Sequence, residues 1–170
     1  MKRLITIFAV AATMMLSFTA NAQQKFGHVN SQEVFYSMPE VAAVEQELIA
    51  KGQALEAQIG ILYTQYETLV VDIQENGPSW MQAVLEAKYN EVYLLEEKIM
   101  LAEEQAQTEL YNMEMEKLAP IEEKAYNAIQ AVASANGYTY VLDSSVGVFL
   151  VLPEGDDLTN MVKAHLGIAY

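Results

Sequence analysis

The sequence predicts an α+β fold in which a long antiparallel α-helical coiled-coil hairpin is inserted in a small β body. Two observations indicate the hairpin: apolar residues recur at helical spacing, and a strong breaker, Asn76-Gly77-Pro78-Ser79, divides them into two stretches. A third indicates the body, because short segments typical of strands lie before and after the helical region. We therefore expect the hairpin over residues 38–119, with its tip at 76–79.

The first 22 residues have the pattern of a cleaved signal peptide. A short basic start precedes an apolar stretch, and Ala20 and Ala22 supply the small residues that a signal peptidase needs. An N-terminal membrane anchor is the alternative, but no stop-transfer sequence follows. We expect export to the periplasm and one mature domain at 23–170. The chain has no cysteine, so neither a lipid anchor nor a disulfide is expected.

The chain is strongly acidic, with a formal net charge of −14 at pH 7. Cleavage would remove two of the 9 basic residues, Lys2 and Arg3, and none of the 23 acidic ones, which takes the net charge to −16. Such a charge repels nucleic acid and anionic lipid, so we expect neither as a partner. Because the many apolar residues lie in helical stripes, the chain is not a disordered acidic tail.

The predicted hairpin has one apolar seam, along which its two arms face each other. Successive seam residues within an arm are three, four or seven positions apart, which places them on one side of a helix. When the chain is folded at Gly77, Leu55 falls opposite Ile99 and Gly52 opposite Ala102. The seam residues are Val44, Leu48, Gly52, Leu55, Ile59, Leu62 and Leu69 in the first arm, and Leu85, Val92, Leu95, Ile99, Ala102, Ala106 and Leu110 in the second.

The ends of the arms carry helix signals. The segments Ser37–Glu40 and Ser79–Gln82 have the spacing of capping boxes, and Pro39 is tolerated in the first turn of a helix. Pro120 is expected to kink the second arm where it enters the body, so that a separate helix covers residues 120–136.

The remaining segments predict the body. We expect strands at 25–30, 138–143 and 146–152, and a closing helix at 157–167. These elements form a small core, and the outer faces of the arms have no partner within the chain. A protein with so little core usually needs further contacts, so we predict a homo-oligomer whose strands complete one shared sheet or barrel.

Three stretches outside the arms are specific enough to compare with known families. They are Phe26–Asn30 followed by Glu33-Val34-Phe35, the segment Gly137–Asp143, and Asp157-Leu158-Thr159. Together with the signal peptide and the charged hairpin, they resemble the Skp/OmpH family of periplasmic outer-membrane-protein chaperones. The resemblance covers essentially the whole mature chain.

The resemblance implies a homotrimer in which the three chains share one β body and three hairpins surround a cavity. It also implies that unfolded outer-membrane proteins, the clients, are held there without ATP or any cofactor. The best-known members of the family are basic, whereas this chain is acidic and has no Lys/Arg cluster that matches a lipopolysaccharide motif. We therefore predict no lipopolysaccharide site, and client binding that is either apolar or directed at basic segments.

Six residues are candidates for contact with clients. Trp80 and Met81 lie beside the tip, and such side chains suit adaptable apolar contacts; alternatively, Trp80 closes the turn by packing on Ile73. The other candidates lie partly off the seam and either line the cavity or form ordinary half-buried helix surface. They are Tyr63, Val70, Tyr89 and Tyr93.

No pattern in the sequence indicates an enzyme or a metal site. Adjacent glutamates such as Glu96 and Glu97 point about 100° apart on a helix, which suits a solvated face. His28 and His165 lack the spacing of metal ligands, and Asp143 at the end of a strand is typical of a turn. We expect no catalytic, metal-binding or cofactor-binding residue.

Two functions follow from this reading. The first is an ATP-independent periplasmic holdase that keeps unfolded outer-membrane or envelope proteins in a cavity between helical arms. The alternative is an envelope adaptor that binds one folded partner through the hairpin tip. A holdase would slow the aggregation of several unrelated proteins, whereas an adaptor would bind one partner saturably.

Overall fold

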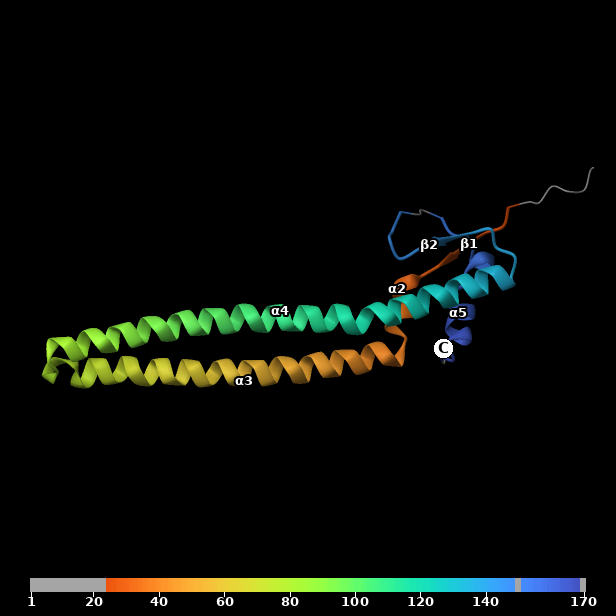
Figure 1. Ribbon diagram of the computed structural model, residues 1–170. Helices are drawn as coiled ribbons and strands as arrows, with labels where there is room; N and C mark the ends of the chain where they lie inside the picture. Colours follow the sequence, from red (N-terminus) through yellow and green to blue (C-terminus); the bar gives the residue numbers. More distant parts are fainter. Residues whose placement is uncertain (1–23, 149–150, 169–170) are drawn as a thin grey trace, which may run out of the picture.

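A computed structural model describes residues 24–148 and 151–168, which form two parts of different shape (Figure 1). Two long helices lie side by side and project from a small body that holds the short elements. The elements are β1 (Phe26–Val29), α2 (Ser31–Tyr36), α3 (Pro39–Asn76), η2 (Gly77–Ser79), α4 (Gln82–Ala135), β2 (Tyr140–Asp143), η3 (Glu154–Asp156) and α5 (Thr159–His165). The predicted α+β class with a long helical hairpin is confirmed.

The predicted signal peptide, with Ala20 and Ala22, lies outside the described residues. So do positions 149–150 and 169–170. Among the helices of the described residues, none combines the length and the apolar character that a membrane crossing requires.

Both long helices begin without a side-chain cap, so the two predicted capping boxes are wrong. The N-cap residues are Met38 for α3 and Met81 for α4, and neither side chain bonds the helix N-terminus. The Ser37 hydroxyl instead donates to a carbonyl oxygen near the end of α2, and the Ser79 hydroxyl donates to the carbonyl oxygen of Asn76. Each hydroxyl therefore bonds the helix before it rather than the helix after it; the Glu33 carbonyl oxygen that Ser37 contacts also accepts the Ser37 backbone N–H.

The second arm and the helix expected over 120–136 form one continuous helix, α4, with Pro120 inside it. Pro120 has no N–H to give to the carbonyl group of Glu116, so one hydrogen bond of the helix is missing there. Figure 1 shows the part of α4 in the body inclined to the part in the arm. The helix thus changes direction without ending.

The arms are antiparallel, but their register differs from the predicted one. An ideal Cβ on Gly52 would have Leu110 as its nearest side chain, at 4.0 Å, where the fold about Gly77 predicted Ala102. The difference of eight residues corresponds to about 12 Å along a helix. Its cause lies at the tip, because η2 continues from α3 and the chain reverses only at Trp80 and Met81, which have extended backbones.

The sheet of the body has two parallel strands, joined by the whole hairpin. β1 pairs with β2 in a register that sets Phe26 beside Tyr140 and Val29 beside Asp143. Between α4 and β2, Gly137 has φ +70° and its neighbour Tyr138 donates its N–H to a carbonyl oxygen of the last helical turn. This is the left-handed helix end typical of an Asn-Gly pair.

The strand predicted over 146–152 is absent from the part of that segment that the structure describes, 146–148 and 151–152. Gly147 has φ +66°, a left-handed conformation that interrupts an extended strand. Val146 and Val148 are exposed, so these apolar side chains of the predicted strand are not covered by the part of the chain that the structure describes.

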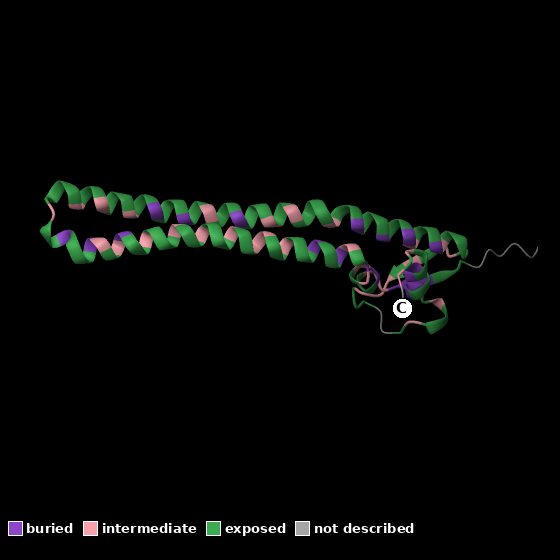
Figure 2. Ribbon diagram, turned by 90° about the horizontal axis from the view of Figure 1, so that it is seen from below, coloured by how far each residue is buried: buried purple, intermediate pink, exposed green. Residues whose placement is uncertain are grey.

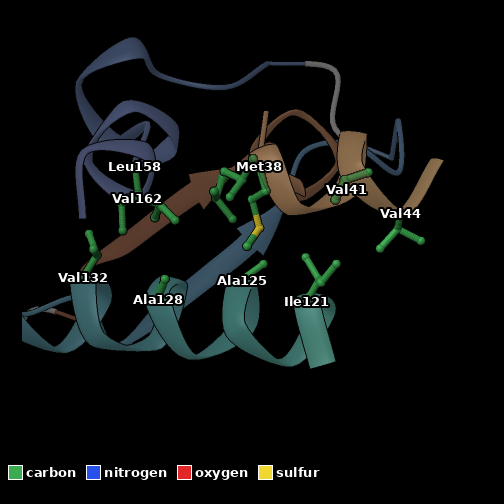
Figure 3. Packing of buried hydrophobic residues seen from close by; sticks show 11 residues of the cluster. Met38, Val41, Val44, Ile121, Ala125, Ala128, Val132, Leu158 and Val162 are labelled. Atoms are coloured by element: carbon green, nitrogen blue, oxygen red, sulfur yellow. The ribbon is translucent and has the colours of Figure 1, made fainter. Parts of the chain in front are cut away.

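One apolar core holds the body together and reaches the foot of both arms (Figure 3). Met38, Val34, Leu158 and Val162 are its fully buried members. Figure 3 shows the side chains of α4 from Ile121 to Val132 lining one side of it, while α5 and the start of α3 line the other. The closing helix α5 is shorter than the predicted 157–167, because Asp157 and Leu158 connect it to η3 and it ends at His165.

The short helix α2 was not predicted. Its N-cap is Asn30, whose side-chain oxygen accepts a hydrogen bond from the backbone N–H of Glu33 at 2.9 Å. The Glu33 carboxylate in turn accepts from the nearly buried Lys163 ammonium at 2.7 Å, which joins α2 to α5. The Asn30–Glu33 spacing is a helix start signal that the sequence carries.

Candidate functional site

The interior of the hairpin is the seam, and it leaves two long faces free. All fourteen predicted seam residues are buried or half-buried, which Figure 2 shows as purple and pink segments on the facing sides of the arms. Near the tip, Leu69, Ile73 and Leu95 form a cluster. The seam therefore holds the arms together, and contacts with other molecules are left to the faces on either side.

Two hydrogen bonds cross from arm to arm along one edge of the seam. The Tyr63 hydroxyl donates to the Glu103 carboxylate at 2.8 Å, and the Tyr66 hydroxyl donates to the Glu96 carboxylate at 3.1 Å. These hydrogen bonds, aided by the negative charges, raise the pKa of Tyr63 and of Tyr66 above the ordinary value. These two hydrogen bonds show that the side of α3 with Tyr63 and the side of α4 with Glu103 belong to the same face of the hairpin.

The face that bears these hydrogen bonds is rich in exposed aromatic residues, and we call it the tyrosine face. On α4, the positions 89, 93, 96, 100, 103, 107 and 111 follow one another by three or four residues and so lie on one side of the helix. The tyrosine face consists of Tyr63, Tyr89, Tyr93, Met100 and Tyr111, with Glu96 and Glu103. Tyr89 is 57% exposed, Tyr93 67% and Tyr111 62%.

The opposite face carries the lysines of the arms, and we call it the lysine face. Three of its lysines form ion pairs: Lys51 with Glu109 at 2.6 Å, Lys117 with Glu47 at 2.7 Å, and Lys88 with Glu91 at 3.1 Å. Lys88 and Lys98 also line an open groove of about 730 Å³ between the arms near the tip. Both signs of charge are present here, in contrast to the tyrosine face.

Five of the six candidate contact residues fall into two groups, on the tyrosine face and at the tip. Tyr63, Tyr89 and Tyr93 lie on the tyrosine face, and half-buried Val70 lies at its edge, seven residues after Tyr63. Met81 is 76% exposed at the tip.

Trp80 belongs to neither group. It is half-buried against the cluster of Leu69, Ile73 and Leu95, which agrees with its interpretation as a turn-closing residue.

Sequence reasoning missed two members of the tyrosine face. Met100 is 61% exposed, and Tyr111 stands at the same helical phase as Tyr89 and Tyr93. The sequence contains the signal for both residues. Steps of three or four residues from Tyr89 along the second arm lead to Met100 and Tyr111.

The body presents a second unpartnered surface, around the edge of β2. Phe26 and Tyr140 are half exposed, and their rings stack with centroids 5.2 Å apart and planes inclined by 16°. Further exposed apolar residues continue this surface along β2 and the segment that follows. They are Leu142, Val146, Val148 and Val151.

Asp143 and His28 form hydrogen bonds that stabilise the body. Asp143 accepts hydrogen bonds from the hydroxyls of Ser31 and Ser145 at 2.5 and 2.8 Å. Partial burial alone would raise the pKa of Asp143, but these hydrogen bonds outweigh it and bring the pKa below the ordinary value. His28 Nε2 donates to the carbonyl oxygen of Pro153 at 3.0 Å. Among the described residues, no group of acidic or histidine side chains is placed to hold a metal ion.

Comparison with known proteins agrees with this architecture. The chain is 23% identical to the chaperone protein Skp of Vibrio cholerae serotype O1 over 136 residues, which are 80% of each chain. It is also 23% identical to chaperone protein Skp of Photorhabdus laumondii over 162 residues, 95% of this chain and 97% of that protein.

A solved structure from Caulobacter crescentus CB15, described as an OmpH-like outer membrane chaperone, has the same fold. It superposes with a TM-score of 0.74 at 18% identity and covers 86% of both chains. The family described as outer membrane protein (OmpH-like) matches residues 25–166, which include every helix and strand of the structure. The chain therefore belongs to the OmpH-like family.

Proposed function

We propose that the protein is an ATP-independent holdase of the periplasm that binds unfolded outer-membrane or envelope proteins between its helical arms. The observation that carries the proposal is the hairpin itself. Two helices of 38 and 54 residues share one seam, and large apolar side chains stay exposed along the tyrosine face. Exposed apolar surface of this extent marks an interaction site. The similarity to chaperones named Skp supports the same function.

The proposal includes a homotrimer. The exposed apolar surface includes Tyr140 and Leu142 of β2, a strand that has only β1 beside it in the described sheet, and an unpaired strand edge can pair with another chain. Bodies joined through this surface would set several hairpins around one space. A client held there makes many weak contacts, so that unrelated sequences are accepted without specific recognition.

No observation favours the adaptor hypothesis over the holdase. An adaptor that binds through the tip needs an anchor there, and Trp80 is engaged with the seam cluster instead. Met81 is the exposed tip residue that remains, which makes it the useful control.

The test is an aggregation assay with the mature chain, residues 23–170. An unfolded outer-membrane β-barrel protein is diluted from urea, and light scattering is followed with and without equimolar chaperone trimer, in the absence of ATP. We expect suppression of scattering for two unrelated barrels, and the same suppression by Met81→Ser. Unchanged scattering with both barrels would overturn the proposal, and loss of activity in Met81→Ser would favour the adaptor.

A further inference from the structure

The charges on the tyrosine face have one sign. On α3, the positions 45, 49, 56, 63, 67 and 70 share the side that carries Tyr63, and on α4 the positions 96, 103 and 114 share the side that carries Tyr89. All the charged residues at these positions are glutamates: Glu45, Glu56, Glu67, Glu96, Glu103 and Glu114. The lysines of the arms lie on the seam or on the lysine face.

Two of these carboxylates are held in place but carry no balancing cation. Tyr63 orients Glu103 and Tyr66 orients Glu96 through hydrogen bonds across the arms. Neither carboxylate forms an ion pair with a lysine, arginine or histidine of the part of the chain that the structure describes. On the lysine face, by contrast, glutamates of the same arms are used to pair with lysines.

The exposed rings on the same face add a second attraction for cations. Tyr89, Tyr93 and Tyr111 each expose more than half of their surface. Aromatic faces attract ammonium and guanidinium groups, and the flexible Met100 side chain adapts to varied apolar partners. A bound segment with alternating basic and apolar residues could therefore place its basic groups near carboxylates and rings, and its apolar groups near apolar side chains, within one turn of the helix.

We propose that the tyrosine face binds unfolded chain segments that carry lysine or arginine among apolar residues. The inference rests on the proposed holdase function and specifies which part of a client the arms take. Glu96 and Glu103 attract the basic groups, and the tyrosine rings and Met100 contact the basic and apolar side chains. The lysine face is not part of the proposed site, because three of its lysines already pair with glutamates and Lys98 would repel basic groups.

Two fluorescent, disordered peptides test this directly with the full mature chain. One is a 30-residue peptide in which lysine alternates with leucine, tyrosine and serine; the second has glutamate at every lysine position. Binding is measured by fluorescence anisotropy at low salt and at about 0.5 M salt, where exposed charges are largely screened. We expect the basic peptide to bind about tenfold more tightly at low salt, with the difference reduced at high salt.

Matched variants then locate the site. Glu96→Gln/Glu103→Gln keeps the acceptor oxygens for Tyr66 and Tyr63 and removes two charges; Glu91→Gln/Glu109→Gln removes two charges from the lysine face. We expect the first variant to bind the basic peptide about fivefold more weakly, and the second to bind like wild type. Tyr89→Ala/Tyr93→Ala should weaken binding about fivefold, whereas Leu94→Ala/Leu101→Ala, which trims exposed residues on the opposite side of α4, should not.

Each outcome decides between the two proposals. If aggregation is suppressed but both peptides bind equally, or both double-glutamine variants lose the same affinity, the tyrosine face is not a site for basic segments and the holdase function stands. If the basic peptide binds through the tyrosine face but aggregation is not suppressed, the binding site stands and the holdase function fails. Absence of both activities overturns both.

Discussion

Tyr66 on α3 and Glu96 on α4 are joined across the arms by a hydrogen bond of 3.1 Å between the phenolic hydroxyl and the carboxylate. The pair lies in the axial register that the turn at Trp80 and Met81 gives the hairpin. Gly52 and Leu110, farther from the tip, and Gly77 and Leu85, beside it, are neighbours in the same register. The two arms therefore make contacts in one register at several positions along their length.

This register predicts which engineered cysteines will react, and the chain has no native cysteine to interfere. We expect the pair Gly52→Cys/Leu110→Cys to be joined rapidly by a short bis-thiol cross-linker. The pair Gly52→Cys/Ala102→Cys should react slowly, because its two positions differ in axial level by about 12 Å. Denaturing gel electrophoresis with peptide mapping separates the products. Equal or reversed yields would contradict the register.

Removing the Glu103 charge should lower the pKa of Tyr63. The hydrogen bond to Glu103 and the nearby negative charge stabilise the protonated phenol, which raises its pKa. Such a contribution to stability is present below the unfolded pKa and is lost as the pH rises through the folded one. In Glu103→Gln the tyrosine should titrate at lower pH than in wild type, as followed by NMR of labelled tyrosine. Tyr66, bonded to Glu96, is the internal control and should keep its wild-type titration.

The seam could be predicted from the sequence because helical periodicity alone decides which side of a helix is apolar. The register could not, because it depends on where the chain reverses. Gly77 looks like the turning point, yet η2 carries the chain onward and the reversal falls at Trp80 and Met81. The exposed tyrosines were found in part, since they keep the helical phase without belonging to the seam.

The body was harder to predict, because a segment forms a strand only where another strand is available to pair with it. β1 and β2 were expected, and they pair although a hairpin of about a hundred residues separates them. The segment 146–152 has strand-like apolar residues, but Gly147 is left-handed and no strand of the described chain pairs with residues 146–148. The local sequence pattern does not tell whether another strand is available to pair with a segment.

Gly27→Ala should destabilise the body. A Cβ at this position would lie 2.5 Å from Leu158 Cδ1 and 2.8 Å from the ring of Tyr138, and Leu158 is fully buried, so its side chain has little room to shift. We expect a loss of about 2–3 kcal/mol in the free energy of unfolding, measured by urea denaturation with circular dichroism. Gly60→Ala, within α3 and with open space around it, should instead stabilise by about 0.5–1 kcal/mol. A neutral Gly27→Ala would show that the sheet can move away from α5.

Acid should weaken the contact between β2 and α2. The pKa of Asp143 lies below its ordinary value of 3.8, because the hydrogen bonds from Ser31 and Ser145 outweigh the effect of burial. The stabilisation is therefore present above the unfolded pKa and lost as the pH falls through the folded one. Ser31→Ala should cost about 1 kcal/mol at pH 7 and flatten the decline of stability below about pH 4. Urea denaturation between pH 7 and pH 3 measures both effects.

Ser144→Ala provides the matched control, because Ser144 donates its backbone N–H to the Val29 carbonyl oxygen. This backbone hydrogen bond survives the substitution. The control should keep the wild-type stability at neutral pH and the wild-type slope in acid. A Ser31→Ala variant with the same slope as Ser144→Ala would rule out the role given to the Asp143 hydrogen bonds.

Val146→Glu should prevent assembly of the proposed trimer while leaving the hairpin intact. Val146 is 65% exposed in the turn that follows β2, so a charge there costs little in the monomer but would be buried without a partner in the proposed interface between chains. Sedimentation at micromolar concentration should give a trimer for wild type and a monomer for the variant, with unchanged helical circular dichroism. Ile61→Glu places the same charge at an equally exposed position on an arm and should remain trimeric. A wild-type monomer would remove the trimer from the proposal, and a trimeric Val146→Glu would move the interface away from β2.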